Sequence, residues 1–462
     1  MSERNDHSSN TVNSASQPAT EQQEQVRAGN NSSPATTIAI VGGAGDLAKK
    51  LLLPGIAEYA AMSGTNVRII GADMADDVDY PAYFAAALEA SGTPTETLSS
   101  LIAQSTYFQV DATSAADLQK LMDVATEQQV AGPILYFALP PMITARALKA
   151  LEGVKLPDGV VLALEKPIGE SLETARAVNE QLAKLVGEEQ IFRVDHFLGL
   201  SGTVNIEGLR ASNMLIDPIW NAQHIDEVRI VFNETIGLED RAAFYDKTGA
   251  AVDMIQSHLI QVMSHVLADE DTSPSEILRM SKAVEARRGR YTAGTVGGKE
   301  LPSYVDEPGV EPSRNTETWA RIQLAVDTDR WRGIPIILES GKGIGHPRRE
   351  ISAVFRQTQD GAPANVLRLS FESDELGIEV NANDPSDPDA SEWNARITLS
   401  SGLVPSKLGA YGRVARSLLT GEKHLRLTAA AAEEGWRIIE PVLESYDSLP
   451  LEEYEAGTTP GQ

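Results

Sequence analysis

The fold is decided by Thr36-Thr37-Ile38-Ala39-Ile40-Val41-Gly42-Gly43-Ala44-Gly45-Asp46, a stretch near the start of a 462-residue chain. Its β-branched first half is typical of a buried parallel strand, and residues 47–60 after it predict a helix that Pro54 kinks or breaks. Between strand and helix, Gly42 and Gly45 permit a tight turn whose backbone can approach a pyrophosphate at the helix N-terminus. The glycine pattern alone is weakly specific, because a turn without a ligand has the same spacing.

Further strand-like runs alternate with helical ones in the first part of the chain. This alternation predicts a doubly wound sheet of parallel strands. The runs lie at residues 66–71, 106–110, 134–138 and 160–164.

After about residue 192 the pattern changes. A long helix is predicted over 251–267, and strand candidates then follow one another without helices between them, which indicates a mostly antiparallel sheet. We therefore predict an α/β protein, with an N-terminal Rossmann-like doubly wound domain and a C-terminal α+β domain that holds a large, mostly antiparallel sheet. The predicted parts are a disordered tail (1–35), a dinucleotide-binding domain (36–192), a substrate-binding and oligomerisation domain (193–450) and a loose C-terminus (451–462).

Composition excludes several classes of function. The chain has 39 Lys and Arg against 66 Asp and Glu, a net charge of −27, which disfavours binding to nucleic acid or to anionic lipid. It has no cysteine, so disulfides, thiolate nucleophiles and zinc–cysteine sites are excluded. No run of about 18 apolar residues predicts a membrane span, and no secretory signal is recognised. We expect a cytoplasmic protein with no nucleic-acid or membrane partner.

The extended turn Gly42-Gly43-Ala44-Gly45-Asp46-Leu47-Ala48-Lys49-Lys50 is more distinctive than its glycines. Further motifs follow in order: Ala138-Leu139-Pro140-Pro141, Glu165-Lys166-Pro167-Ile168-Gly169, Arg193-Val194-Asp195-His196-Phe197-Leu198-Gly199, Phe244-Tyr245-Asp246, Asp253-Met254-Ile255-Gln256-Ser257-His258-Leu259, Arg330-Trp331-Arg332-Gly333-Ile334-Pro335 and Ser340-Gly341-Lys342. Together they resemble the glucose-6-phosphate dehydrogenase family over about residues 36–450.

The resemblance implies a catalytic pair. His258 would remove the proton of the sugar's anomeric hydroxyl while hydride leaves the same carbon for a nicotinamide, and imidazole suits this role because its pKa lies near neutrality. Asp195 would orient and stabilise the histidine, although by itself it could also be a helix N-cap. Asp253 lies five residues before His258, about 140° around an α-helix, so the two should not pair.

The resemblance also implies the ligands of substrate and cofactor. Sugar-phosphate ligands would be Lys166, His196, Glu234, Asp253 and Lys342. Cofactor contacts would be Gly42, Gly45, Asp46, Leu47, Lys50, Pro141 and Lys166. To these the position of an acidic residue at the end of the second strand adds Asp73. No metal is required. Taken singly, carboxylates such as Glu234 and Asp253 are more often solvated surface groups.

The sequence contains one indication for NAD and one for NADP as the cofactor. Asp73 follows the second strand, where an acidic residue commonly accepts hydrogen bonds from the ribose of NAD. Lys50 keeps the family's basic position near the 2′-phosphate of NADP. We rank NADP first and keep NAD as the alternative.

Two residues depart from the family pattern. Phe197 and Leu200 stand where the family has a Tyr and a Lys that hold the substrate phosphate, and each such hydrogen bond is worth about 1.5–3 kcal/mol. Arg348 and Arg349 could compensate, or could be solvated surface charges.

Three functions therefore stay open. The first is a glucose-6-phosphate 1-dehydrogenase that binds a hexose phosphate and forms 6-phosphogluconolactone. The second is a related dehydrogenase with another hexose as its substrate, and the third is a catalytically silent relative. The resemblance also implies a homodimer or homotetramer.

Overall fold

The computed structural model describes residues 35–76, 78–89, 95–127, 132–358, 361–382, 395–402 and 406–460. The chain from Ala35 onward forms one compact unit. The predicted disordered tail lies outside the described residues except for Ala35. Among the described residues, no helix has the length and apolar character needed to cross a membrane.

The first sheet contains seven strands in the described part of the chain. Its strands run parallel except for β17, which pairs antiparallel with β6. In spatial order they are β17 (Arg426–Leu427), β6 (Ile191–Val194), β5 (Val161–Leu164), β4 (Ile134–Phe137), β1 (Thr36–Val41), β2 (Val67–Asp73) and β3 (Ser105–Gln109). The chain order reverses between β1 and β4, which is the position where doubly wound sheets bind ligands.

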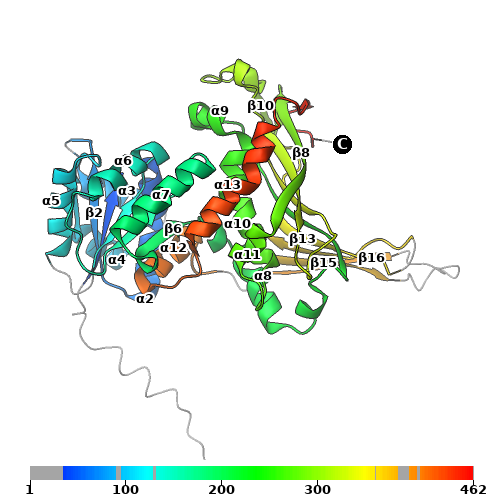
Figure 1. Cartoon of the computed structure of the whole chain (residues 1–462), viewed down its shortest axis with the longest axis horizontal. Helices are drawn as coiled ribbons and strands as arrows, with labels where there is room; N and C mark the ends of the chain where they lie inside the picture. Colours follow the sequence, from blue (N-terminus) through cyan, green and yellow to red (C-terminus); the bar gives the residue numbers. More distant parts are fainter. Residues whose placement is uncertain are drawn as a thin grey trace, which may run out of the picture. The chain divides into compact units, whose positions relative to one another are not determined.

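Helices cover both faces of this sheet (Figure 1). Alternate residues of β1 therefore enter different cores: Ile38 and Ile40 pack with α2 and α3, whereas Ala39 and Val41 pack with α5 and α6. The helical segments are η1 (a π-helix, Ala48–Leu52), α2 (Leu53–Ser63), α3 (Tyr80–Leu88), α4 (Thr95–Ala103), α5 (Ala115–Thr126), α6 (Pro141–Leu151), α7 (Leu172–Leu185), η2 (Glu188–Gln190) and η3 (His196–Gly199). Pro54 does not break the helix as predicted: the π-helix passes directly into α2, and Pro54 lies in the first turn of α2, where proline is tolerated.

The second sheet has nine strands among the described residues and is mostly antiparallel, as predicted. Two neighbouring pairs, β12 with β7 and β18 with β8, are parallel. The spatial order is β16 (Ala395–Gly402), β15 (Glu375–Ala382), β14 (Val366–Ser370), β13 (Arg349–Phe355), β7 (Ile225–Asn233), β12 (Ile336–Gly341), β11 (Trp319–Val326), β8 (Ser281–Thr292) and β18 (Leu451–Glu455). A short hairpin joins β9 (Gly294–Val296) to β10 (Lys299–Leu301).

Helices from several parts of the chain pack on the second sheet and join it to the first. Apolar residues of η6 and α10 pack with the buried side of β7, and α13 contacts α7, α10 and β8 (Figure 1). The segments are α8 (Ser201–Ser212), η4 (Asp217–Ile219), η5 (Glu239–Arg241), α9 (Ala242–Ala250), η6 (Ala251–Leu259), α10 (Ile260–Leu267), α11 (Pro274–Arg279), η7 (Tyr304–Asp306), η8 (Pro312–Arg314), α12 (Ala410–Thr420) and α13 (Ala429–Glu444).

The C-terminus corrects one prediction. Residues 451–462 were expected to be loose, but Leu451–Glu455 forms β18 along β8, and Tyr454 and Ala456 are buried. The Tyr454 hydroxyl also donates a hydrogen bond to the Lys342 carbonyl at 2.8 Å, so packing offsets the ordering cost of this segment. The domain boundary near residue 192 stays a prediction.

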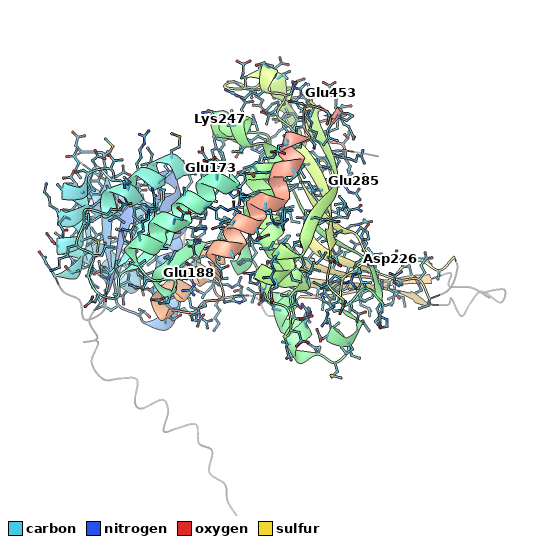
Figure 2. All side chains as sticks on the ribbon, in the orientation of Figure 1. Glu173, Glu188, Asp226, Lys247, Glu285 and Glu453 are labelled. Atoms are coloured by element: carbon cyan, nitrogen blue, oxygen red, sulfur yellow. The ribbon has the colours of Figure 1, made fainter. Side chains whose placement is uncertain are left out.

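Exposed acidic side chains lie on the strands of the second sheet and on helices that pack around the first. Figure 2 labels exposed carboxylates on elements of each: Glu173 on α7, Glu188 on η2, Asp226 on β7, Glu285 on β8 and Glu453 on β18. The negative charge is thus spread over the surface around both sheets.

Candidate active site

In the turn after β1, Gly42 and Gly43 have no room for a side chain. Gly42 has a φ of 87°, and a Cβ there would lie 2.4 Å from the Ala138 carbonyl oxygen. At Gly43, a Cβ would lie 2.8 Å from the Gly71 Cα. The turn therefore sits against the ends of β4 and β2, with bare backbone at the position where a dinucleotide would rest. Glycine is needed at residue 43 as well as at residue 42, which the spacing argument missed.

The predicted cofactor residues surround this turn. Asp73 ends β2, and its carboxylate accepts backbone N–H bonds from Met74 at 2.7 Å and from Ala44 in the turn at 3.3 Å. Lys50 and Asp46 form an exposed ion pair of 2.9 Å one helical turn apart. The remaining predicted residues also lie at these strand ends: Leu47 precedes η1 and Pro141 begins α6. The turn fits a nicotinamide dinucleotide, while each residue's contact with it stays a prediction.

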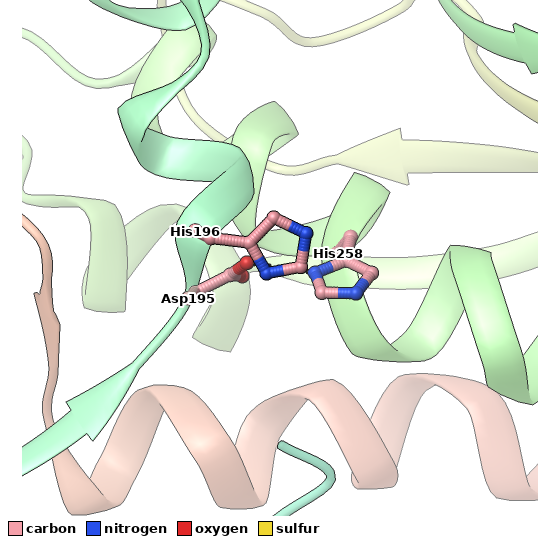
Figure 3. Close-up of side chains that lie close together, drawn as sticks. All are labelled: Asp195, His196 and His258. Carbon is pink, nitrogen blue, oxygen red and sulfur yellow. Dashed lines mark hydrogen bonds and ion pairs between the residues drawn. The ribbon is translucent and has the colours of Figure 1, made fainter. Parts of the chain in front are cut away.

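Asp195 is the centre of the predicted catalytic group. It follows β6 and has no exposed surface. One carboxylate oxygen accepts from the Lys166 Nζ at 2.8 Å, and the other accepts from the Phe197 backbone N–H at 3.1 Å. This second oxygen also lies 2.7 Å from the His258 Nδ1; Figure 3 shows the side chains of Asp195 and His258 together with His196. Asp195 is thus both the predicted partner of His258 and the cap of the short helix η3.

The charges in this group fix its protonation. Burial disfavours the charged form of Asp195, but the Lys166 ammonium and the hydrogen bond with His258 outweigh it and hold its pKa well below the usual range. An ionised carboxylate accepts a hydrogen bond from the Nδ1–H of His258, which leaves Nε2 as the basic nitrogen. The side chain of His258 is only 13% exposed, so water has limited access to it.

His196 and Phe197 enclose the His258 ring. The Phe197 ring stacks on it with centroids 4.2 Å apart, and the His196 ring meets it edge-on at 4.9 Å. Burial lowers the pKa of His196 to about 3, so this imidazole is neutral near pH 7. Leu200, at the second departure from the family pattern, is half-buried against the main core.

The other predicted substrate ligands gather around a buried tyrosine, Tyr245. Lys342 Nζ donates to Glu234 at 2.6 Å and lies over the Tyr245 ring at 5.3 Å. Burial raises the pKa of Tyr245, and the charges of Asp253 and Glu234 raise it further. Tyr245 was not predicted as a site residue, although it is the middle residue of the Phe244-Tyr245-Asp246 motif.

The segment η6 carries both Asp253, a predicted substrate ligand, and His258, the predicted base. Its geometry changes the predicted angle between these two side chains. Residues 251–259 form a π-helix, in which hydrogen bonds join residues five apart. Asp253 and His258 therefore lie near one face, and the 140° that an α-helix would give does not apply. They still have different partners, because Asp253 pairs with Arg241 at 3.1 Å.

Arg348 and Arg349, suggested as cations that compensate for the missing phosphate ligands, differ in their contacts. Arg349 is already bound: its Nη1 lies 2.7 Å from both Glu372 carboxylate oxygens, and its Nε donates to the Asn233 carbonyl. Arg348 is half-buried, and nothing in the structure places it against the catalytic group.

Asp195, His196 and His258 are also the one set of such residues, in the part of the chain described, close enough to hold a metal ion. Both oxygens of Asp195 already have partners, and one of these is the Lys166 ammonium. This arrangement fits acid–base chemistry, and the prediction of a metal-free reaction stays a prediction.

Comparisons with known proteins agree with this architecture. Residues 39–205 match the family "Glucose-6-phosphate dehydrogenase, NAD binding domain", and residues 207–462 match "Glucose-6-phosphate dehydrogenase, C-terminal domain". A glucose-6-phosphate 1-dehydrogenase of Gluconobacter oxydans is 32% identical over 463 residues, which cover 91% of this chain and 93% of the relative. A glucose-6-phosphate 1-dehydrogenase 2 of Mycobacterium bovis is 34% identical over 354 residues, 70% of this chain and 69% of the relative.

Solved structures are similar over the same length. The crystal structure of a glucose-6-phosphate 1-dehydrogenase from Mycobacterium avium has a TM-score of 0.79 at 27% identity and covers 92% of this chain and 94% of that one. A glucose-6-phosphate dehydrogenase in complex with its substrate glucose-6-phosphate shares the fold, with a TM-score of 0.82 at 24% identity over 93% and 96% of the two chains. With both of its parts matched and a relative above 30% identity along almost its full length, this chain belongs to the glucose-6-phosphate dehydrogenase family.

Proposed function

We propose that this protein is a glucose-6-phosphate 1-dehydrogenase that oxidises the C1 hydroxyl of glucose 6-phosphate to 6-phosphogluconolactone, with NADP as hydride acceptor. The observation that carries the proposal is the buried arrangement of Lys166, Asp195 and His258 within one hydrogen-bonded group. Family membership and the activity named for its relatives support it.

The residues supply the acid–base part of the reaction. His258 Nε2 takes the proton of the C1 hydroxyl, and the ionised Asp195 stabilises the imidazolium that forms. The nicotinamide, when bound, supplies the acceptor for the C1 hydride. Lys166, His196, Glu234, Asp253 and Lys342 are proposed to bind and orient the sugar phosphate through its hydroxyls and anionic end.

Cofactor preference is the finer part of the proposal. Lys50 supports NADP, although Asp46 pairs with it, and residues 71–80 contain no arginine that could hold a 2′-phosphate. Asp73 beside the turn supports use of NAD. We propose NADP as the first cofactor and NAD as the alternative.

Phe197 and Leu200 favour a second candidate function, oxidation of another hexose. Phe197 packs on Phe232, Phe371 and the His258 ring, and Leu200 packs against the main core. Neither side chain offers a donor to a phosphate. An unphosphorylated sugar would lose little from these changes, whereas glucose 6-phosphate loses two hydrogen bonds worth about 1.5–3 kcal/mol each.

Initial rates with glucose 6-phosphate and with glucose, each with NADP and with NAD, test these proposals together. We expect the highest kcat/KM with glucose 6-phosphate and NADP. A higher value with glucose would favour the second candidate. Cofactor binding without reduction in all four mixtures would contradict both and favour the catalytically silent relative.

We also propose, from the sequence, a homodimer or homotetramer with a cytoplasmic location. The net charge of −27 supports the absence of nucleic-acid and anionic membrane partners.

A further inference from the structure

Glu165 is a titratable residue close to the catalytic group that the proposed reaction does not use. It follows the last residue of β5 and precedes Lys166. Two buried tyrosines donate hydrogen bonds to the same oxygen, Oε1: Tyr136 from β4, and Tyr411 from α12 at 3.1 Å. Two phenol donors on one oxygen hold this carboxyl in a single position between the first sheet and α12.

Tyr411 connects this carboxyl to the catalytic group. Its ring stacks on His196, with centroids 5.1 Å apart and planes 25° apart. Phe197 at 5.1 Å and His258 at 4.9 Å meet the His196 ring edge-on. Since burial keeps His196 neutral, its position depends on ring packing and not on an ion pair. The Tyr411 ring is the stacked member of that packing.

The protonation of these groups supports a lasting contact. Burial raises the pKa of Glu165 to about 7, and burial also raises the pKa of Tyr136 and of Tyr411. The phenols therefore keep their protons near neutral pH and remain donors whether Glu165 is charged or not. Glu165 also precedes Lys166, whose Nζ is fixed on Asp195, so two routes lead from it to the site.

We propose that Glu165 is a positioning residue for the dehydrogenase reaction: through Tyr411 it holds the His196 ring where that ring meets the phosphorylated sugar. This inference rests on the proposed function. It predicts that removal of the carboxyl weakens sugar-phosphate binding more than turnover or cofactor binding, because the Asp195–His258 pair keeps its own hydrogen bond.

The test compares Glu165→Ala with the conservative Glu165→Gln, in the full chain with glucose 6-phosphate and NADP. Glu165→Ala should raise the KM for glucose 6-phosphate about 10- to 100-fold, which corresponds to the loss of one hydrogen bond between His196 and the charged phosphate. The changes in kcat and in the KM for NADP should be smaller. Glutamine keeps an acceptor oxygen for both tyrosines and should restore a KM close to wild type. A purely structural role would lower stability without this pattern.

Glu58→Ala is the matched control, since Glu58 accepts the Gly409 backbone N–H at 2.9 Å and so also holds the start of α12. We expect its KM to stay within about twofold of wild type. An unchanged KM in Glu165→Ala, or an equal rise in Glu58→Ala, overturns the inference. If Glu165→Ala does not fold, Tyr411→Leu should give the same rise in KM, and a wild-type KM there overturns it equally.

The wild-type protein in the same assay separates the two proposals. A wild type that reduces no cofactor contradicts the proposed function, and the inference with it. An active wild type alongside an unaffected Glu165→Ala contradicts the inference alone.

Discussion

Two histidines on one continuous helical segment, η6 followed by α10, each pair with a carboxylate, and the nitrogen–oxygen distance is the same in both pairs. In one, His258 Nδ1 lies 2.7 Å from Asp195; in the other, seven residues later, His265 Nδ1 lies 2.7 Å from Glu207. The two histidine side chains are also equally exposed, at 13% and 14%. Neither distance nor histidine burial therefore distinguishes a catalytic pair from a structural one.

The difference lies with the carboxylates. Asp195 is fully buried and its second oxygen is bound by the Lys166 ammonium at 2.8 Å. Glu207 is 31% exposed, and its second oxygen lies 3.4 Å from His424, a half-exposed side chain. A buried carboxylate with a fixed cation stays ionised and orients its histidine in one way, whereas a carboxylate open to water is screened.

Replacement of the two histidines should give the largest contrast. His258→Ala removes the base, and loss of general-base catalysis lowers kcat by about 10²–10⁴-fold. His265→Ala removes the pair outside the catalytic group and should leave kcat near wild type. Initial rates with glucose 6-phosphate and NADP measure both. Wild-type turnover in His258→Ala, or an equal loss in His265→Ala, would show that the base is misassigned.

The carboxylates should differ in what they contribute to acid stability. The pKa of Asp195 lies below its unfolded value of about 3.9, so its contribution is present above that pH and is lost as the pH falls. Removing one partner of a buried pair costs about 3–5 kcal/mol, because Lys166 is left uncompensated, so Asp195→Asn should be less stable by that amount at pH 7.

Urea unfolding between pH 3 and pH 7 measures this contribution, with Glu207→Gln as the control. The difference between wild type and Asp195→Asn should shrink as the pH approaches 3. A difference that stays constant over this range would mean that Asp195 has an ordinary pKa in the folded protein.

Strands β1 to β5 of the first sheet could be predicted closely because their signals are local, whereas β6 and β17 of the same sheet were missed. The strand at 36–41 has the predicted bounds, since β-branched residues fill both of its buried faces and glycines end it. The long strand β8 (Ser281–Thr292) was missed, because Lys282, Glu285 and Arg287 give it a polar pattern. The polar residues of β8 find partners only on the neighbouring strands of the folded sheet; Arg287, for example, pairs with Glu452 of β18.

The residues of the candidate site also fall into those that a local motif predicts and those that only the folded chain reveals. Motifs gave Asp195 and His258, and the structure joins them across 63 positions of sequence. Tyr411 carries no motif, and its contact with Glu165 spans 246 positions, so only the folded chain reveals it. The π-helix at η6 was missed for a related reason, since i→i+5 bonding leaves no residue pattern that sequence reasoning uses.

The smallest effect is expected from Glu207→Gln. Glu207 lies on α8, which begins shortly after Asp195 and the short helix η3. Its partly exposed pair should contribute only about 0.2–1 kcal/mol, and salt should weaken it further. A double-mutant cycle with His265→Ala, by urea unfolding at low and high salt, should give a coupling energy in this range. Coupling of several kcal/mol, or a kcat loss comparable to that of Asp195→Asn, would mean that solvent exposure of the carboxylate does not separate the two pairs.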